Sequence, residues 1–154
     1  MHPSAQRVAD VLAERGATGR VREFTQATKT SQQAAAALGC DLGAIASCLV
    51  FLVDGQAVIV IKSGRHRVDT ERLAAAARGA TARQATPDEV RRATGQPIGG
   101  VSPVGWPAPM RAFIDESLTD YDVIWSAAGT PNAVFPTTYA ELAALTGATP
   151  LLLS

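Results

Sequence analysis

The chain has 154 residues, of which 47% are hydrophobic and 18% charged, a balance typical of a folded globular protein and not of a disordered one. This length favours a single domain over residues 1–154, and no run reaches the roughly 20 apolar residues that a membrane span needs. The net charge is zero, which excludes the strongly basic character of proteins that bind long DNA duplexes, so we expect no DNA partner.

The N-terminal part predicts two helices and a short strand. Its first residues, MHPSAQRVAD, lack the basic start and apolar stretch of a signal peptide, so we expect a cytoplasmic protein. Residues 4–15 place apolar side chains on one helical face, and residues 20–24 alternate as a short strand does. The segment TSQQ that begins at Thr30 fits a capping box, and the alanine run after it predicts a helix that stops at Gly39.

A hairpin follows. Residues 45–53 and 56–61 are two nearly continuous apolar runs rich in β-branched side chains. Asp54-Gly55 between them supplies the positive φ angles of a type I′ turn. Both runs look apolar on two faces, so we expect these two strands at the centre of a sheet.

Two further helices are expected in the middle of the chain. Asp69 can cap a helix that runs through residue 77 and ends at Gly79. The segment TPDE at 86–89 combines a capping box with Pro at the first helical position, and Gly95 ends that helix.

The remaining third predicts a long loop, two strands, a helix and an edge strand. Residues 95–109 (GQPIGGVSPVGWPAP) are too rich in Gly and Pro for a helix or a central strand, and a loop this long is usually functional. Strands are expected at 110–114 and 123–127, a third capped helix at 138–145, and an edge strand at 150–153. Helices and hairpins mixed in this way predict an α+β domain with one curved, mixed, barrel-like sheet flanked by helices.

Within the long loop, the motif GGVSP is the candidate for chemistry. The backbone N–H groups of Gly99, Gly100 and Val101 could polarise an ester carbonyl and stabilise the oxyanion formed on hydrolysis. Pro103 would fix the exit of the loop, and no role is assigned to the hydroxyl of Ser102. The alternative is a sharp turn that merely connects two elements.

Cysteine and histidine offer little further chemistry. Cys40 and Cys48 make neither a disulfide framework nor a zinc site, and we interpret both as thiols that pack in the core. A thiol–imidazole pair of Cys48 and His66 is disfavoured, because Cys48 lies in a strand that we expect to be buried. With two histidines and no cluster of metal ligands, we expect no metal and no cofactor.

Positive charge is concentrated at residues 62–92, which carry eight basic and four acidic side chains. Within this stretch Arg65, His66 and Arg67 form a basic loop that could meet a short run of phosphates, or simply be a solvated surface loop. Trp106 could stack on a nucleic-acid base, or anchor its own loop by hydrophobic contacts.

Four segments together resemble one protein family. TGQPIGGVSPVGWPAPMRAFID at 94–115 is similar to the TG-x-x-x-GG-x-x-P-x-G segment of the YbaK and prolyl-tRNA-synthetase-associated deacylases, with its GxxxP loop. IASCLVF at 45–51 resembles the central strand of that family, and SGRHRVDTERLA at 63–74 its SG-x-x-RVD stretch. VIWSAAGTPNAVFPTTYAELAALTGA at 123–148 resembles its closing strand–turn–strand–helix. The resemblance spans about residues 28–150.

This resemblance implies an activity. Members of the family hydrolyse the ester between a small, wrong amino acid and the terminal adenosine of a tRNA, often a proline tRNA. Such editing is needed because a synthetase pocket discriminates one methylene by only about 1–3 kcal/mol. In the family, backbone amides of the GxxxP loop hold the aminoacyl carbonyl, and water attacks with help from a ribose hydroxyl of the substrate. The implied partners are the acceptor end of tRNA and a prolyl-tRNA synthetase.

One departure from the family pattern concerns the central strand. Well-studied members carry Lys there, another branch carries Asn, and this chain has Ser47, which we expect to orient ribose or water. Lys62 at the end of the neighbouring strand either supplies a replacement charge or is a solvated strand end. Thr30 and Gly129 complete the set of residues expected to bind substrate and tRNA, together with Trp106. Ser47 also favours an alternative, a weak or inactive module that binds aminoacyl-tRNA or aminoacyl-adenosine; a hydrolase of small-molecule esters is the second.

Overall fold

The structure is a computed structural model and describes residues 1–25 and 30–153. The helices are α1 (Pro3–Glu14), α2 (Ser31–Leu38), α3 (Thr70–Ala76), α4 (Pro87–Thr94) and α5 (Tyr139–Thr146), with short 3-10 turns at Leu42–Ala44 and Glu116–Asp120. The strands are β1 (Arg22–Glu23), β2 (Ile45–Val53), β3 (Gln56–Ser63), β4 (Ala82–Gln84), β5 (Arg111–Asp115), β6 (Ile124–Ala127), β7 (Ala133–Thr137) and β8 (Thr149–Leu151). Among the described residues no helix is long and apolar enough to cross a membrane.

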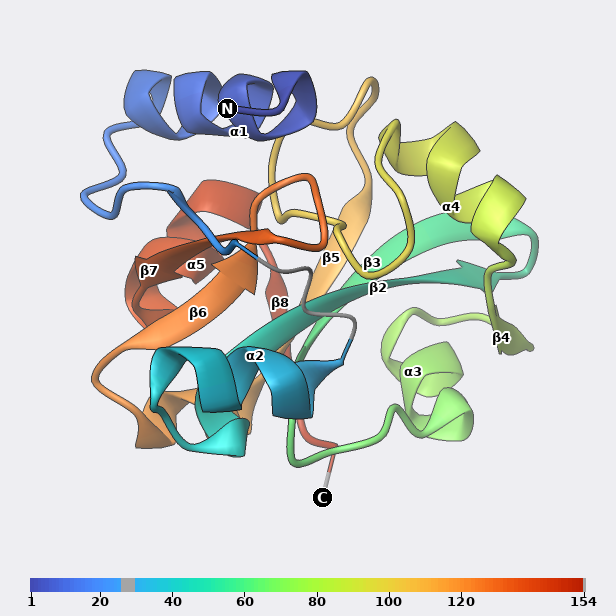
Figure 1. Cartoon of the computed structure of the whole chain (residues 1–154). Helices are drawn as coiled ribbons and strands as arrows, with labels where there is room; N and C mark the ends of the chain where they lie inside the picture. Colours follow the sequence, from blue (N-terminus) through green and yellow to red (C-terminus); the bar gives the residue numbers. More distant parts are fainter. Residues whose placement is uncertain (26–29, 154) are drawn as a thin grey trace.

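The strands form one mixed sheet, which confirms the α+β class (Figure 1). Its order in the described chain is β1-β7-β6-β2-β3-β5-β8, and β4 adds to β2 beside this path. The pairs β2–β6, β3–β5 and β5–β8 are parallel, and the other pairs are antiparallel. The sheet is open, with β1 and β8 at its two ends, so the expected barrel-like curvature does not reach closure.

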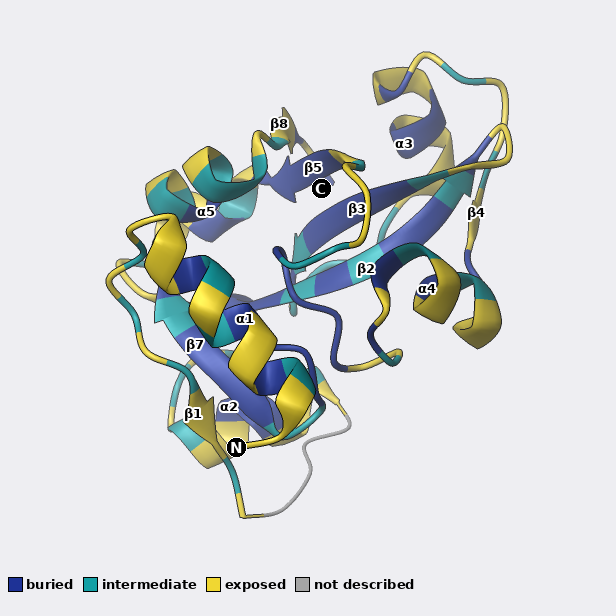
Figure 2. Ribbon diagram, turned by 90° about the horizontal axis from the view of Figure 1, so that it is seen from above, coloured by how far each residue is buried: buried dark blue, intermediate teal, exposed yellow. Residues whose placement is uncertain are grey.

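The central hairpin is as predicted. Asp54 and Gly55 have φ values of 49° and 83°, which is the left-handed backbone that a type I′ turn requires. Four consecutive residues of β3, 58–61, are at most 2% exposed. Apolar side chains cover both faces of this hairpin because α3 and α4 lie on opposite sides of it (Figure 2). Val60 and Phe51 share a buried cluster with Leu73 of α3, whereas Ile59 belongs to the cluster that includes Val90 of α4.

One edge of β2 is divided between two strands. Along its other edge β2 pairs with β3 at every residue from 46 to 53. On the divided edge β6 pairs at Ile45 and Ala46, and β4 pairs only at residues 51–53. Residues 47–50 of β2 therefore lie at a split in the sheet, where β6 and β4 diverge. Open crevices of this kind, where strands separate, are common places for ligand sites in α/β sheets.

The threonine caps predicted for three helices are confirmed, since Thr30, Thr86 and Thr138 each accept from the backbone N–H three residues further on. In α4 the capping box is complete, because Glu89 bonds back to the N-cap backbone. In α5 the predicted capping box is only half formed, because the carboxylate of Glu141 accepts from a threonine of β7 at 2.8 Å and ties the helix to the sheet.

The end of α3 differs from the prediction. The helix ends at Ala76, and the left-handed residue that follows is Arg78, with φ 58°, instead of Gly79. Gly79 donates its N–H to the carbonyl of Ala74 at 2.8 Å, as the residue after a left-handed cap does. A Cβ on Gly79 would lie 2.5 Å from Val53 Cγ1, so glycine is needed there for close approach to β2.

Candidate functional site

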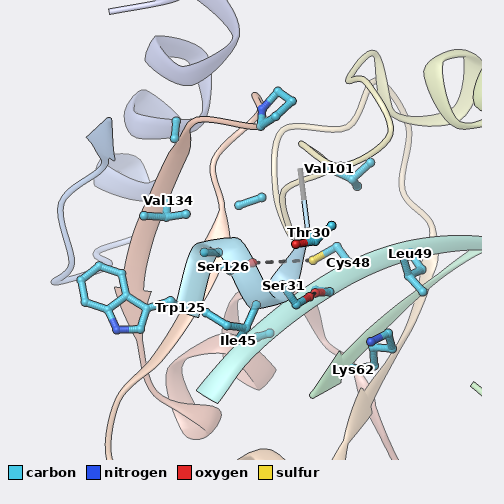
Figure 3. Close-up of a pocket in the computed structure, with 17 residues that line it drawn as sticks. Thr30, Ser31, Ile45, Cys48, Leu49, Lys62, Val101, Trp125, Ser126 and Val134 are labelled. Atoms are coloured by element: carbon cyan, nitrogen blue, oxygen red, sulfur yellow. Dashed lines mark hydrogen bonds between the residues drawn. The ribbon is translucent and has the colours of Figure 1, made fainter. Parts of the chain in front are cut away.

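A pocket of about 270 Å³ lies at the split in the sheet (Figure 3). Its walls are the start of β2, the N-terminus of α2, the end of β6, the start of β7 and the 95–109 loop. Five of the predicted site residues line it: Thr30, Ser47, Lys62, Gly99 and Val101. Thus the fold brings residues from three distant parts of the chain to one place, near the small end of the roughly 300–1,000 Å³ range of ligand pockets.

The 95–109 loop is held in place by a buried polar cluster. Gln96 is 4% exposed, and its side-chain oxygen accepts from the N–H of Ser102 at 2.8 Å. The hydroxyl of Ser102 donates to the carbonyl of Val104 and accepts from Gln96 Nε2 at 3.0 Å. Trp106 Nε1 donates to the carbonyl of Ser102 at 2.9 Å, and its side chain packs against the buried cluster that includes Val101.

This cluster bears on two interpretations from the sequence. Ser102, to which no role was assigned, is completely buried and fastens the loop. Trp106 has the contacts of an anchor and does not line this pocket, and its stacking on a base stays a prediction. Pro103 of the same loop is also buried.

We expect Ser102→Ala to lower the free energy of unfolding by about 1–3 kcal/mol, because the buried amide of Gln96 would lose its hydroxyl partner. Urea denaturation measures this change. Thr119→Ala is the matched control: it removes an exposed hydroxyl with one bond, 2.7 Å long, to the carbonyl of Glu116 and should cost less than about 0.5 kcal/mol. Equal costs for the two variants would contradict the fastening role.

The three predicted backbone donors are not equivalent. Gly100 donates its N–H to the carbonyl of Pro97 at 2.9 Å, so this amide is used within the loop itself. The amides of Gly99 and Val101 find no acceptor among the described residues, and both residues line the pocket. Two residues that line the pocket therefore keep a backbone N–H without an acceptor among the described residues.

Gly100 has a different part in the site. A Cβ on this residue would lie 2.7 Å from the carbonyl carbon of Thr130 and 2.9 Å from the nitrogen of Pro131. Glycine at 100 thus lets the loop pack directly on the turn between β6 and β7, and sets the position of the two donors on either side. Gly129 belongs to the same turn, with φ 94°, and its Cα faces the backbone of Ser4 in α1.

The opposite wall carries hydroxyls and one amine. Ser47 Oγ lies 2.9 Å from the Oγ of Ser31, the first residue of α2. Ser47 and Lys62 are directly opposite each other in the β2–β3 register, so their side chains emerge on the same face. Lys62 Nζ donates to the carbonyl of Ser63 at 3.4 Å and makes no ion pair with a described carboxylate. Burial lowers the pKa of Lys62, and the charge of Asp115 opposes that shift.

The basic loop lies outside the pocket, and two of its three side chains are engaged. Arg65 pairs with Asp120 at 3.2 Å and lies over the ring of Tyr121. His66 Nδ1 lies 2.8 Å from Asp115 Oδ2, which also accepts from the backbone N–H at residue 63. Burial alone would raise the pKa of Asp115, but these bonds lower it. Arg67 is exposed and has no partner among the described residues.

Cys48 lines the pocket as a buried thiol. It is 7% exposed, and its Sγ lies 3.7 Å from Ser126 Oγ on β6. Burial raises the pKa of Cys48 to about 12, with the bond to Ser126 opposing the shift, so no thiolate is present near neutral pH. The described residues contain no group of three His, Cys, Asp or Glu side chains placed to hold a metal ion.

We expect iodoacetamide at pH 8 to modify Cys40 and leave Cys48 unmodified in the folded protein, since only the thiolate reacts and Cys40 is partly exposed. Mass spectrometry of the tryptic peptides measures both sites, and unfolding in urea should equalise them. Modification of Cys48 as fast as that of Cys40 under native conditions would revive the idea of a reactive thiol.

Sequence reasoning missed Ser31 and the apolar wall made by Trp125, Pro131 and Val134. The sequence indicated for Ser31 only that it begins a helix. For Trp125 the hydrophobic pattern of 123–127 indicated a strand but no role in a site. The wall residues become neighbours through the parallel pairing of β2 with β6, which no local pattern encodes.

Comparison with known proteins agrees with this architecture. The family model of the aminoacyl-tRNA editing domain matches residues 25–145. The uncharacterized protein YwhH of Bacillus subtilis (strain 168) is 32% identical over 123 residues, which are 79% of this chain and 78% of that protein. The crystal structure of a candidate trans-editing enzyme for prolyl tRNA synthetase superposes with a TM-score of 0.94 at 42% identity, covering 100% of this chain and 98% of that one. The hypothetical protein APE2540 superposes with a TM-score of 0.89 at 29% identity, covering 96% and 98% of the two chains. The chain belongs to the family of aminoacyl-tRNA editing domains.

Proposed function

We propose that the protein is a free-standing, single-domain trans-editing deacylase, which hydrolyses the ester of a small amino acid wrongly attached to tRNA. The observation that carries this proposal is the pair of unpartnered backbone amides, Gly99 and Val101, on the wall of a small pocket. Two preorganised donors of this kind are what an oxyanion needs. Ser47 and Lys62 face the same pocket and supply polar contacts for the nucleotide end of the substrate.

In this mechanism the aminoacyl carbonyl oxygen accepts from the two amides. Water attacks the carbonyl carbon while a ribose hydroxyl of the substrate takes up its proton. The same hydroxyl gives its own proton to the leaving ribose oxygen as the C–O bond to the ribose breaks. No described Asp, Glu or His lines the pocket, which favours assistance by the substrate over a protein base.

The substrate's tRNA is expected to lie along the exposed side of the pocket. Lys62 would bind the terminal phosphate or ribose, Ser47 would orient ribose or water, and Arg67 would meet acceptor-stem phosphates. By analogy with the candidate trans-editing enzyme, we propose a proline tRNA as substrate and an association with prolyl-tRNA synthetase in the cytoplasm.

A second candidate is a binding module that holds aminoacyl-tRNA without turnover. Ser47 favours it, since it stands where well-studied relatives have a Lys. A panel of tRNAs charged with alanine, cysteine, serine or proline, measured beside a small ester such as p-nitrophenyl acetate, separates the possibilities. We expect release of a small amino acid from at least one mischarged tRNA, unchanged by EDTA. Activity confined to the small ester, or abolished by EDTA and restored by zinc, would refute the proposal.

A further inference from the structure

The split in the sheet leaves main-chain groups of β2 without a strand partner. On the divided edge, the pairing with β6 stops at Ala46 and the pairing with β4 starts at Phe51. Between them, the carbonyl of Val50 accepts from the N–H of Ala85 at 3.0 Å, so the main-chain groups of Val50 face this edge. Because successive residues of a strand direct their main-chain groups to alternate edges, those of Cys48 face it too.

Cys48 brings these groups to the pocket. It lines the pocket between Ser47 and Leu49, and its thiol contacts Ser126 of β6 across the split (Figure 3). The unpartnered amides of Gly99 and Val101 line the same pocket from the 95–109 loop. The pocket therefore combines backbone donors on the loop with a backbone carbonyl on β2.

The charges around the pocket indicate which ligand group this carbonyl would suit. None of the described residues that line the pocket is Asp or Glu, so an amine bound there must be held by neutral oxygens. The cation of the pocket, Lys62, lies on β3, which occupies the other edge of β2. The main-chain groups of Cys48 therefore point to the edge of β2 that faces away from Lys62. A positively charged amine bound there is repelled less by the Lys62 ammonium than one bound on the other edge.

We propose that the backbone carbonyl of Cys48 accepts a hydrogen bond from the α-amino group of the aminoacyl ester. This inference rests on the proposed function and extends it to specificity. When the ester carbonyl lies at Gly99 and Val101, the amine is carried by the adjacent carbon, and β2 forms another wall of the same pocket. The site would then select esters with a free α-amine, and a tRNA that carries an N-blocked amino acid or a peptide would escape hydrolysis.

Binding of three non-hydrolysable compounds tests this. Adenosine with a 3′-amide to alanine, to propionic acid, which lacks the amine, and to N-acetylalanine would each be titrated calorimetrically into the protein. We expect the propionyl compound to bind at least about tenfold more weakly than the alanyl compound, the scale of one hydrogen bond to a charged group. The N-acetyl compound should bind at least as weakly as the propionyl one. Equal affinities of the alanyl and propionyl compounds, or no binding of either, would overturn the inference.

These compounds keep the two proposals separable, because none of them is hydrolysed. If the protein prefers the compound with the amine but deacylates no charged tRNA, the proposed enzymatic activity is refuted and the amine site is supported. If it deacylates alanyl-tRNA and N-acetylalanyl-tRNA at equal rates, the enzymatic activity is supported and the amine site is refuted.

The sequence offers a direct probe of the carbonyl itself. Cys48-Leu49 is the only Cys–Leu pair, since the other cysteine, Cys40, precedes Asp41. Protein labelled with ¹³C-carbonyl cysteine and ¹⁵N-leucine therefore gives one carbonyl–amide correlation, which reports on Cys48. The alanyl compound should shift the carbonyl resonance and the propionyl compound should not. The same shift with both, or with neither, would assign the amine to another acceptor.

Discussion

Gly100→Ala is expected to lower kcat/KM for a mischarged tRNA by about 100-fold or more, close to the loss when one oxyanion donor is removed. The new methyl group would lie 2.7 Å from the carbonyl carbon of Thr130 and 2.9 Å from the nitrogen of Pro131. Both are backbone atoms, so the loop must move away from the turn and carry the amides of Gly99 and Val101 with it. Overpacking of this kind should also lower the free energy of unfolding by about 1–3 kcal/mol.

A second variant, Gly99→Ala, has Gly105→Ala as its matched control. This pair separates the cost of backbone strain from an effect on the site. Gly105 and Gly99 have the same φ of 84°, but Gly105 lies outside the pocket and its added Cβ would meet nothing closer than 3.7 Å. Alanine at either position should cost about 1–2 kcal/mol of stability. Only Gly99→Ala should also reduce kcat/KM, by about tenfold or more. Wild-type kinetics for Gly100→Ala would mean that the loop only connects two elements, and would favour the binding module over the deacylase.

Lys62→Ala should lower kcat/KM by roughly 10- to 100-fold, the effect of losing a hydrogen bond from a charged group worth about 1.5–3 kcal/mol. Lys62 faces the pocket without a carboxylate partner among the described residues, so its ammonium is available to a phosphate or ribose. Lys62→Gln, which keeps much of the length without the charge, should behave like Lys62→Ala. Steady-state deacylation kinetics of the wild-type protein, Lys62→Ala and Lys62→Gln measure these effects.

Adding Ser47→Lys to Lys62→Ala distinguishes a substrate contact from a structural role. Ser47 and Lys62 are cross-strand partners, so a lysine at 47 enters the same pocket from the neighbouring strand. We expect this double variant to recover most of the lost activity. Wild-type activity of Lys62→Ala, or a loss that Ser47→Lys leaves unchanged while the variant remains folded, would assign Lys62 to the solvated strand end.

Elements that depend on local chemistry could be predicted from the sequence. The Asp54-Gly55 turn, the capping box at Thr86 and the glycine after α2 act within a few residues, and each lies where expected. The short strand β4 was missed, because its three residues carry a central exposed arginine and no apolar alternation.

The site depended on contacts between distant parts of the chain, and prediction was weaker there. The GGVSP motif predicted a functional loop, but it did not predict that the N–H of Gly100 donates to the carbonyl of Pro97. Such a bond within a turn depends on the conformation of the turn. The charge pattern gave the basic loop at 65–67, whereas acidic partners some 50 residues away in the sequence engage Arg65 and His66. The split edge of β2 comes from strand pairing, which a single hydrophobic run cannot specify.

Single-turnover deacylation tests the central claim most directly. With protein in excess over a proline tRNA charged with alanine, the aminoacyl ester should decay far faster than in buffer alone. With the Gly100→Ala variant, the ester should decay about 100-fold more slowly than with the wild-type protein. The binding of the charged tRNA, measured in parallel, shows that substrate is present on the protein. An ester whose lifetime is unchanged, or lengthened, while the tRNA is bound would contradict hydrolysis and identify a binding module.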